Sequence, residues 1–289
     1  MSAPTQRQGG PRAHRPPAPD TRTPRRGSVR TLTAAVLVTA VVVTGVLGPW
    51  LAPHPPAKTV ATPYAAPAAT HLLGTDHLGR DVLSRLLHGG PSVLLTTAGA
   101  TAATVALGTA VGLLAAFAGH RRPLAEGAVL RPFDALAALP PMLALLLVLT
   151  ALPDLFGIVC ATCAAGVPLS ARVVRAAARP VLGRAHVEVA IARGERWPWV
   201  LRHEVLPLVA PTVLADTGLR FVFALYLISA AGFLGVGVAD TDWGTLILEA
   251  LPGAALQPWA LLAPLSLIAV LAVGVNLLSD ALTRPEGEE

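Results

Sequence analysis

The stretch EVAIARGERWPWVLRHEVLP, residues 188–207, is a polar and arginine-rich interruption between two long apolar runs. Arg193, Arg196 and Arg202 lie within it, and four further arginines precede it between residues 172 and 184. In membrane proteins, Lys and Arg accumulate in the loops that stay in the cytoplasm. The stretch therefore predicts a cytoplasmic loop, in a chain whose apolar runs cross a membrane as helices.

The composition of the whole chain agrees with a membrane protein. Hydrophobic residues make up 53% of the 289 residues and charged residues only 13%, whereas a soluble domain carries about 25% charged residues. The isoelectric point near 10.2 could indicate nucleic-acid binding. However, Lys58 is the only lysine, and the arginines lie in short loops beside apolar runs. We therefore expect contact with a lipid bilayer and no nucleic-acid partner.

Six apolar runs are each long enough to cross about 30 Å of hydrocarbon as a helix. They lie at about 32–51, 91–118, 134–153, 155–173, 207–235 and 259–281. We therefore predict an all-α polytopic membrane protein with six transmembrane helices. Gly108 and Gly112, in the second run, would give that helix a small-residue face for close packing.

Composition also divides the chain into parts. Residues 1–30 are rich in Pro, Arg, Ala and Gly, so we predict a disordered cytoplasmic tail. Residues 31–90 would hold the first membrane helix and an external loop. Residues 91–283 would form the core, which includes the loop at 188–207, and residues 284–289 a C-terminal tail.

Arginine placement orients the six predicted helices. With the N-terminus inside, the arginine-bearing loops at 119–133 and 174–206 and the C-terminal Arg284 all fall in the cytoplasm. The loop at 236–258 then lies outside and contains no Lys or Arg. The loop at 52–90 is the exception, because it lies outside with one lysine and two arginines. We predict that both termini are cytoplasmic.

A second stretch, residues 71–85, reads HLLGTDHLGRDVLSR. It resembles the HPLGTDxLGRDVLSR signature of one permease branch, the C-type subunit of dipeptide, oligopeptide and nickel ABC importers, with Leu72 where Pro is usual. Its glycines permit tight turns, and Asp81 can cap a helix that starts after it. The residues that carry this signature are Gly74, Thr75, Asp76, Gly79, Arg80 and Asp81.

The opening stretch also resembles a known element, the EAA loop of ABC-importer permeases. The matching residues are Glu188, Ala190, Gly194 and Pro207. In that family the loop forms a short helix that docks into a separate ATPase subunit, so the resemblance implies that these four residues take part in ATPase coupling. The residues that depart from the usual pattern are Val189, Ala192, Arg193, Trp197, Pro198, Trp199 and Glu204.

A third resemblance follows the fifth apolar run. Residues 233–238, FLGVGV, and residues 242–250, DWGTLILEA, are similar to the family's FLGLGV and SWGxxLxEA stretches, with Asp242 where Ser is common. Together the resemblances cover about residues 30–285. They imply a type I ABC-importer permease (MetI-like) fold in a bacterial cell membrane. They also imply a second homologous permease, two ATPase subunits, an external substrate-binding protein, and peptides or nickel as substrate.

The chain has no Gly-x4-Gly-Lys-Ser/Thr phosphate loop, so ATP should bind to partner subunits. We expect this chain to be no enzyme and to hold no cofactor and no metal. Cys160 and Cys163 lie in an apolar run and are interpreted as packing residues. His71, His77 and His88 share one loop and are interpreted as scattered polar residues rather than metal ligands.

Two other functions remain open from the sequence. A secondary transporter driven by an ion gradient would carry charged or broken helices near the membrane midplane. Asp216 and Arg220, four residues apart in the fifth run, hint at this, although they can also pair on one helix face for structural reasons. A membrane scaffold that binds partners without transport is the third possibility.

Overall fold

The computed structural model describes residues 25–237 and 239–283. The predicted tails, residues 1–24 and 284–289 with Arg284, lie outside the described residues. Residues 25–30, which we expected in the N-terminal tail, instead form the first turns of a helix. The described helices are α1 (Arg25–Leu51), α2 (Val82–Arg121), α3 (Pro123–Ala137), α4 (Pro141–Ala151), α5 (Leu155–Leu182), α6 (Ala185–Ala192), α7 (Trp197–Val200), the π-helical turn η1 (Leu201–Val205), α8 (Leu206–Phe233), α9 (Trp243–Ala250), the 3-10 turn η2 (Leu251–Gly253) and α10 (Pro258–Thr283).

Five of the described segments are long and apolar enough to cross a membrane as single helices. They are Leu32–Leu51, Val82–Arg121, Leu155–Leu182, Trp197–Phe233 and Pro258–Ala281. A sixth span exists only if α3 and α4 count as one, and these two helices are bent by 87°. The all-α membrane fold is confirmed, with five to six spans.

The predicted single helix at about 134–153 is wrong. Its place is taken by α3, which begins at Pro123 inside the expected loop at 119–133, and by the short α4. Pro140 and Pro141 lie at the break, where their missing N–H groups and fixed φ angles prevent a continuous helix. The prediction from hydropathy alone therefore merged two helices that the prolines separate.

The start of the second predicted helix is also wrong, because α2 begins at Val82 rather than near residue 91. The helix continues through Gly89, Gly90 and Pro91, and the two glycines allow other segments to approach its backbone. A Cβ at Gly90 would lie 2.4 Å from the carbonyl oxygen of Gly45 in α1. The glycines mark a helix contact rather than a helix start. The predicted division of the chain into residues 31–90 and residues 91–283 therefore falls inside α2.

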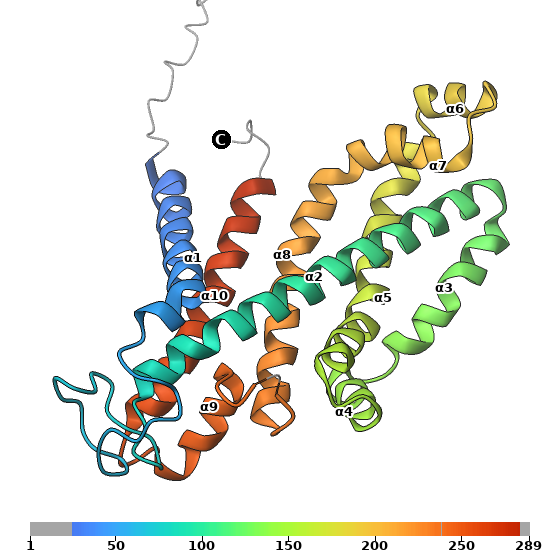
Figure 1. Cartoon of the computed structure of the whole chain (residues 1–289). Helices are drawn as coiled ribbons and strands as arrows, with labels where there is room; N and C mark the ends of the chain where they lie inside the picture. The colour runs from blue at the N-terminus through green and yellow to red at the C-terminus, as the bar shows by residue number, and fades with distance from the viewer. Residues whose placement is uncertain (1–24, 238, 284–289) are drawn as a thin grey trace, which may run out of the picture.

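Helix α2 is the longest helix of the fold and packs against α1, α5 and α8 (Figure 1). The N-terminal end of α1 and the C-terminal end of α10 lie at the same end of the molecule as α6 and α7 (Figure 1). The segment between α1 and α2 lies at the opposite end with α9 (Figure 1). This arrangement agrees with the predicted order of the loops, in which both termini share a side with residues 188–207.

Candidate functional site

The arginine-rich stretch folds as two short helices joined by a turn at Gly194. Gly194 has a φ of 83°, in the left-handed region that favours glycine, and a Cβ there would meet no atom within 4 Å. The backbone N–H of Glu195 donates to the carbonyl of Ala190 (3.3 Å) and so closes the end of α6. Conformation rather than lack of space therefore requires glycine at this turn.

One face of the α6–α7 unit, residues 185–205, is anchored in the protein core. Val187, Ala190 and Val200 are fully buried against α2 and α5. The cluster they join includes Leu113, Ala116, Phe117, Val174, Ala178, Val181, Leu182, Leu201, Val205 and Val209. The small, buried Ala190 lets α6 approach this cluster closely, so the buried face joins the unit to the ends of α2 and α5.

Pro207 lies in the first turn of α8, as we predicted. The helix does not begin there, however, because α7 and the π-helical turn η1 lead directly into α8. The backbone N–H of Leu206 donates to Leu201, five residues back. Pro207 has no N–H to donate, and a π-helical turn next to it keeps the helix continuous without that bond.

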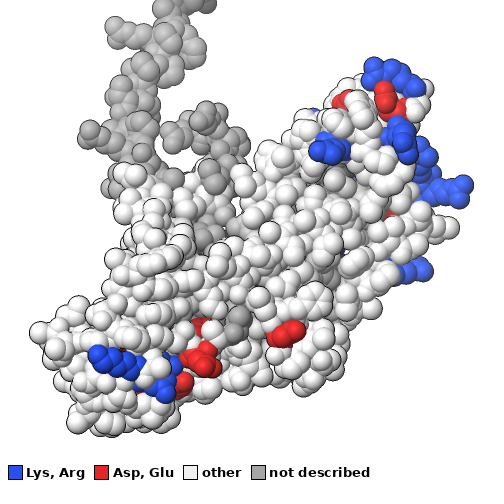
Figure 2. All heavy atoms as spheres, viewed as in Figure 1, with Lys and Arg blue, Asp and Glu red and all other residues white. Residues whose placement is uncertain are grey.

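The opposite face of the unit is exposed and mixes aromatic side chains with arginines. Trp197 is 49% exposed and Trp199 is 37% exposed, and Trp199 stacks on His203 with ring centroids 5.0 Å apart. Positive side chains crowd this end of the molecule (Figure 2). Glu188 is exposed on the same unit. The exposed arginines of the unit are Arg193, Arg196 and Arg202.

The signature stretch forms two tight turns and a helix cap at the other end of the molecule. Gly74 and Gly79 have φ angles of 76° and 73°, and a Cβ at Gly79 would lie 2.1 Å from the carbonyl oxygen of Ala61. Asp81 caps α2, because its Oδ2 accepts from the N–H of Ser84 (3.0 Å). The turns and the cap inferred from the sequence are confirmed.

Two more signature residues are buried and hydrogen-bonded. Thr75 Oγ1 donates to the carbonyl of Thr62 (2.7 Å) and accepts from the N–H of Ala65 (2.8 Å). Asp76 Oδ1 accepts from the backbone N–H groups of Leu78 and Arg80, each at 2.8 Å. These bonds hold the segment between α1 and α2 in one shape, although within it the described residues form only isolated bridges and turns.

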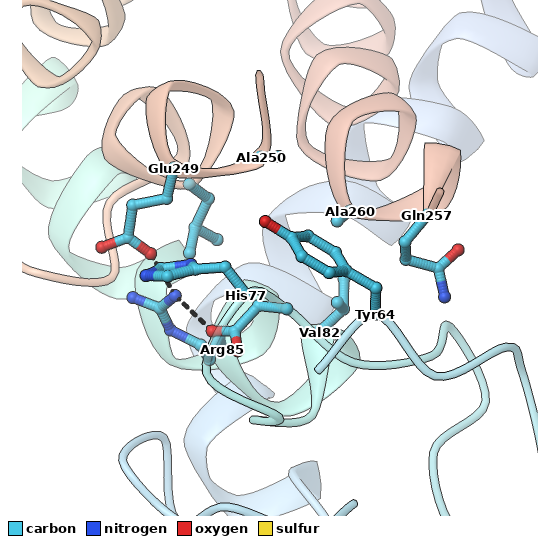
Figure 3. A pocket seen from close by; sticks show the side chains of 10 residues that line it. Tyr64, His77, Val82, Arg85, Glu249, Ala250, Gln257 and Ala260 are labelled. Carbon is cyan, nitrogen blue, oxygen red and sulfur yellow. Dashed lines mark hydrogen bonds and ion pairs between the residues drawn. The ribbon is translucent and has the colours of Figure 1, made fainter. Parts of the chain in front are cut away.

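The structure adds two residues that we did not name as site residues, Arg85 and Glu249, although both lie in the quoted stretches 71–85 and 242–250. Arg85 contacts Asp76 and Glu249 beside a pocket that Tyr64 and Gln257 also line (Figure 3). Arg85 and Glu249 lie far apart in the chain, and no spacing pattern links them.

Possible ligand atoms of Asp76, His77 and Glu249 lie within 4.8 Å of one another, which is compatible with a metal site. The guanidinium of Arg85 already bonds both carboxylates. A bound cation would meet a positive charge, so our prediction that the chain holds no metal is unchanged.

Two further predicted features lie inside the helical region. Asp216 and Arg220 pair across one turn of α8, with Arg220 Nε 3.1 Å from Asp216 Oδ1, and Asp216 is buried. Cys160 and Cys163 are free thiols that line an apolar pocket with Leu107 and Phe133. The interpretation of the cysteines as packing residues stays a prediction.

The order of helices, with an arginine-rich unit between α5 and α8, can be compared with known proteins. Residues 108–284 match the family described as the binding-protein-dependent transport system inner membrane component. The chain belongs to this family. It is 28% identical over 262 residues to the probable D,D-dipeptide transport system permease protein DdpC of Escherichia coli, covering 89% of this chain and 87% of that protein.

A second relative of this permease also has a name that refers to peptide transport. It is 31% identical to the di/tripeptide transport system permease protein DppC of Pseudomonas aeruginosa, covering 84% of this chain and 82% of that protein. Among solved structures, an inward-facing MetNI methionine ABC transporter chain matches 67% of this chain and 95% of its own, with 17% identity and a TM-score of 0.49. The family match and the two permease relatives confirm the predicted ABC permease class, and they do not support the ion-gradient alternative.

Proposed function

We propose that this permease carries di- or oligopeptides across the plasma membrane of a bacterium. The peptides are delivered by an external binding protein, and ATP is hydrolysed by two separate ATPase subunits. A second homologous permease completes the path. The names of relatives over most of the chain, which refer to dipeptide and di/tripeptide transport, support the peptide substrate.

The charge distribution supports the orientation. The α6–α7 unit carries three exposed arginines, Arg193, Arg196 and Arg202, and lies at the same end as the described ends of α1 and α10 (Figures 1 and 2). Because positively charged loops stay in the cytoplasm, we place this end there, and with it both termini. The segment between α1 and α2 and helix α9 then face the outside.

The exposed face of the α6–α7 unit is the proposed docking surface for the ATPase. Trp197 and Val189 expose apolar area, and the exposed arginines around them carry charges without an ion pair among the described residues. Such a surface fits a protein groove with an apolar floor and an acidic rim. This combination of buried anchoring with an exposed aromatic and basic face is the observation that carries the proposal.

The length of the helix favours a protein partner over lipid headgroups at this surface. The continuous helix from Trp197 to Phe233 has 37 residues, which corresponds to about 55 Å at 1.5 Å per residue. The hydrocarbon of a bilayer is about 30 Å thick. The helix is therefore about 25 Å longer than the hydrocarbon is thick, and we place the excess at the arginine-rich Trp197 end.

The permease contributes gating by rigid-body motion and no bond chemistry. When the two ATPase subunits close on ATP, they move the α6–α7 units of the two permeases. Each unit passes the motion to α2 and α5 through the buried cluster around Val187 and Val200. The helices then rearrange around the path, accept the peptide from the binding protein, and return after hydrolysis.

The test is reconstitution of the full complex in proteoliposomes with candidate partner subunits. We expect ATP-dependent uptake of labelled dipeptide that requires the binding protein. Uptake of Ni²⁺ instead of peptide would refute the proposed substrate. ATP-independent uptake driven by an imposed ion gradient would refute the ATP-driven mechanism.

A further inference from the structure

Arg85 joins three separate segments at the proposed outer end of the permease. It lies near the start of α2 and is 2% exposed. Its Nη1 donates to Asp76 Oδ2 (2.9 Å) in the segment between α1 and α2, and also to Glu249 in α9 (Figure 3). Its Nη2 donates to the carbonyl of Asp240 (2.9 Å), in the connection between α8 and α9.

Two neighbouring contacts join the same segments. Trp243, the first residue of α9, is fully buried, and its Nε1 donates to the carbonyl of Leu86 in α2 (3.1 Å). Gln257, just before α10, is buried and its Nε2 donates to the carbonyl of Ala65 (2.8 Å). The outer segment, residues 52–81, is therefore held against α2 and the α9 region by polar contacts from buried side chains.

The two carboxylates depend on Arg85 to different degrees. Asp76 also accepts from two backbone N–H groups, so its charge is stabilised without Arg85. Glu249 has Arg85 as the only side-chain partner that the described residues give it. Inside a protein a paired charge is held firmly, and removing one partner leaves the other poorly solvated. Arg85, bonded both to Asp76 and to Glu249, is thus the charged connection between the outer segment and α9.

Helix α9 is well placed to pass on a displacement. It packs against both α8 and α10. The cap of α9, Asp242, lies against the end of α8, where a Cβ at Gly232 would be 2.1 Å from its Oδ1. The cap of α9 is therefore in direct contact with the outer end of α8.

We propose that Arg85 is a positioning residue that makes the outer segment and α9 a single rigid unit. This step rests on the proposed function: the unit receives the external binding protein and passes the resulting displacement to α8 and α10. Leu72 and Leu78, both exposed on the outer segment, offer the binding protein apolar surface. Arg85 itself is too buried to touch that partner, so it acts through the residues it holds.

The experiment uses the full complex with its ATPase subunits and measures ATP hydrolysis with and without the candidate binding protein loaded with the dipeptide Ala-Ala. The variants are Glu249→Gln and Arg85→Lys. The matched control is Asp240→Asn, which removes an exposed carboxylate nearby but keeps the backbone carbonyl that Arg85 uses. We expect both variants to keep basal hydrolysis, and we expect the stimulation by the binding protein to be at least about five-fold smaller in them. The control should show the full stimulation.

A distance measurement separates positioning from a purely structural role. Spin labels at the exposed Leu72 and Leu248 report on the outer segment and on α9, with Cys160 and Cys163 replaced by alanine. We expect one distance, unchanged by ATP, in the otherwise native protein, and a broadened distribution in Glu249→Gln. This variant retains Arg85 and its bond to Asp76, so it gives a result even where Arg85→Lys fails to fold.

The outcomes distinguish the two proposals. Full stimulation in Glu249→Gln, or a label distance that changes with ATP in the native protein, would overturn the role of Arg85 alone. A native complex in which the loaded binding protein produces no stimulation would overturn the proposed function and this inference together.

Discussion

Gly112 of α2 lies directly against the backbone of Ala171 in α5. A Cβ at Gly112 would lie 2.6 Å from the carbonyl oxygen of Ala171, which is closer than real Cβ contacts. One turn earlier, a Cβ at Gly108 would lie 2.5 Å from Ser170 Cβ. The small-residue face expected from Gly108 and Gly112 is therefore the place where α2 and α5 cross at close range.

This contact predicts that Gly112→Ala destabilises the permease although alanine is the better helix former. Overpacking of this kind costs about 1–3 kcal/mol. Gly99→Ala is the matched control in the same helix, because a Cβ there would meet nothing within 4 Å; it should leave stability unchanged or raise it by up to about 1 kcal/mol. Thermal unfolding of the two variants in the same detergent checks this, and equal midpoints would contradict the close crossing.

The turn at Gly194 predicts opposite outcomes for two substitutions. Gly194→Asn should keep most transport-linked ATP hydrolysis, because asparagine tolerates the left-handed region. Gly194→Pro fixes φ near −65° and should abolish that activity while the protein still inserts in the membrane. ATP hydrolysis by the reconstituted complex, compared with the amount of inserted permease, is the measurement. Normal activity of Gly194→Pro would refute the role of this turn.

Glu188→Arg tests the same surface through charge. Glu188 is exposed and makes no ion pair among the described residues, so its reversal should not affect folding. We expect normal insertion with loss of transport-linked ATP hydrolysis. Arg122→Glu reverses an exposed charge at the same end but outside the α6–α7 unit, and it should retain activity. Equal activity of the two variants would argue against docking through Glu188.

Trp197→Ala should weaken binding of the ATPase subunit to the permease in detergent by about ten-fold or more, since truncation of an interface tryptophan commonly costs at least 1–2 kcal/mol. Trp50→Ala, an exposed tryptophan at the end of α1, should leave the affinity unchanged. A titration with purified ATPase subunit measures both affinities. A loss of binding to anionic vesicles alone, with ATPase affinity intact, would instead assign Trp197 to the membrane surface.

The buried pair in α8 predicts non-additive effects. Asp216→Leu leaves Arg220 nearly buried without its partner and should destabilise the permease by about 3–5 kcal/mol. The double variant Asp216→Leu, Arg220→Met should recover most of that loss, because it removes both charges. Unfolding midpoints test the coupling, and peptide uptake by the double variant tests function. A stable double variant without uptake would show that the pair serves transport directly.

Long apolar runs predicted the helices at 32–51, 155–173, 207–235 and 259–281, because burial in lipid requires such runs whatever the tertiary structure. The continuity of α2 from its cap at Asp81 into the apolar run after residue 91 could not be predicted, because Gly89 and Gly90 serve contacts with segments distant in the chain. The contact between Arg85 and Glu249 could not be predicted for the same reason, because it joins residues that are far apart in the chain. By contrast, the turns at Gly74 and Gly79 and the cap at Asp81 are local, and their residue types were enough to predict them.

The unbroken helix from Trp197 to Phe233 has a mechanical consequence. Its inner end carries the exposed tryptophan, and its outer end rests on the cap of α9. Between them, buried Ala224, Leu227 and Ile228 seat it in a cluster shared with α5. The π-helical turn, Pro207 and Pro211 lie near its inner end, and helices bend at such features. A displacement of the Trp197 end is therefore taken up partly at this bend, and the section packed on α5 determines how much of it reaches the outer end.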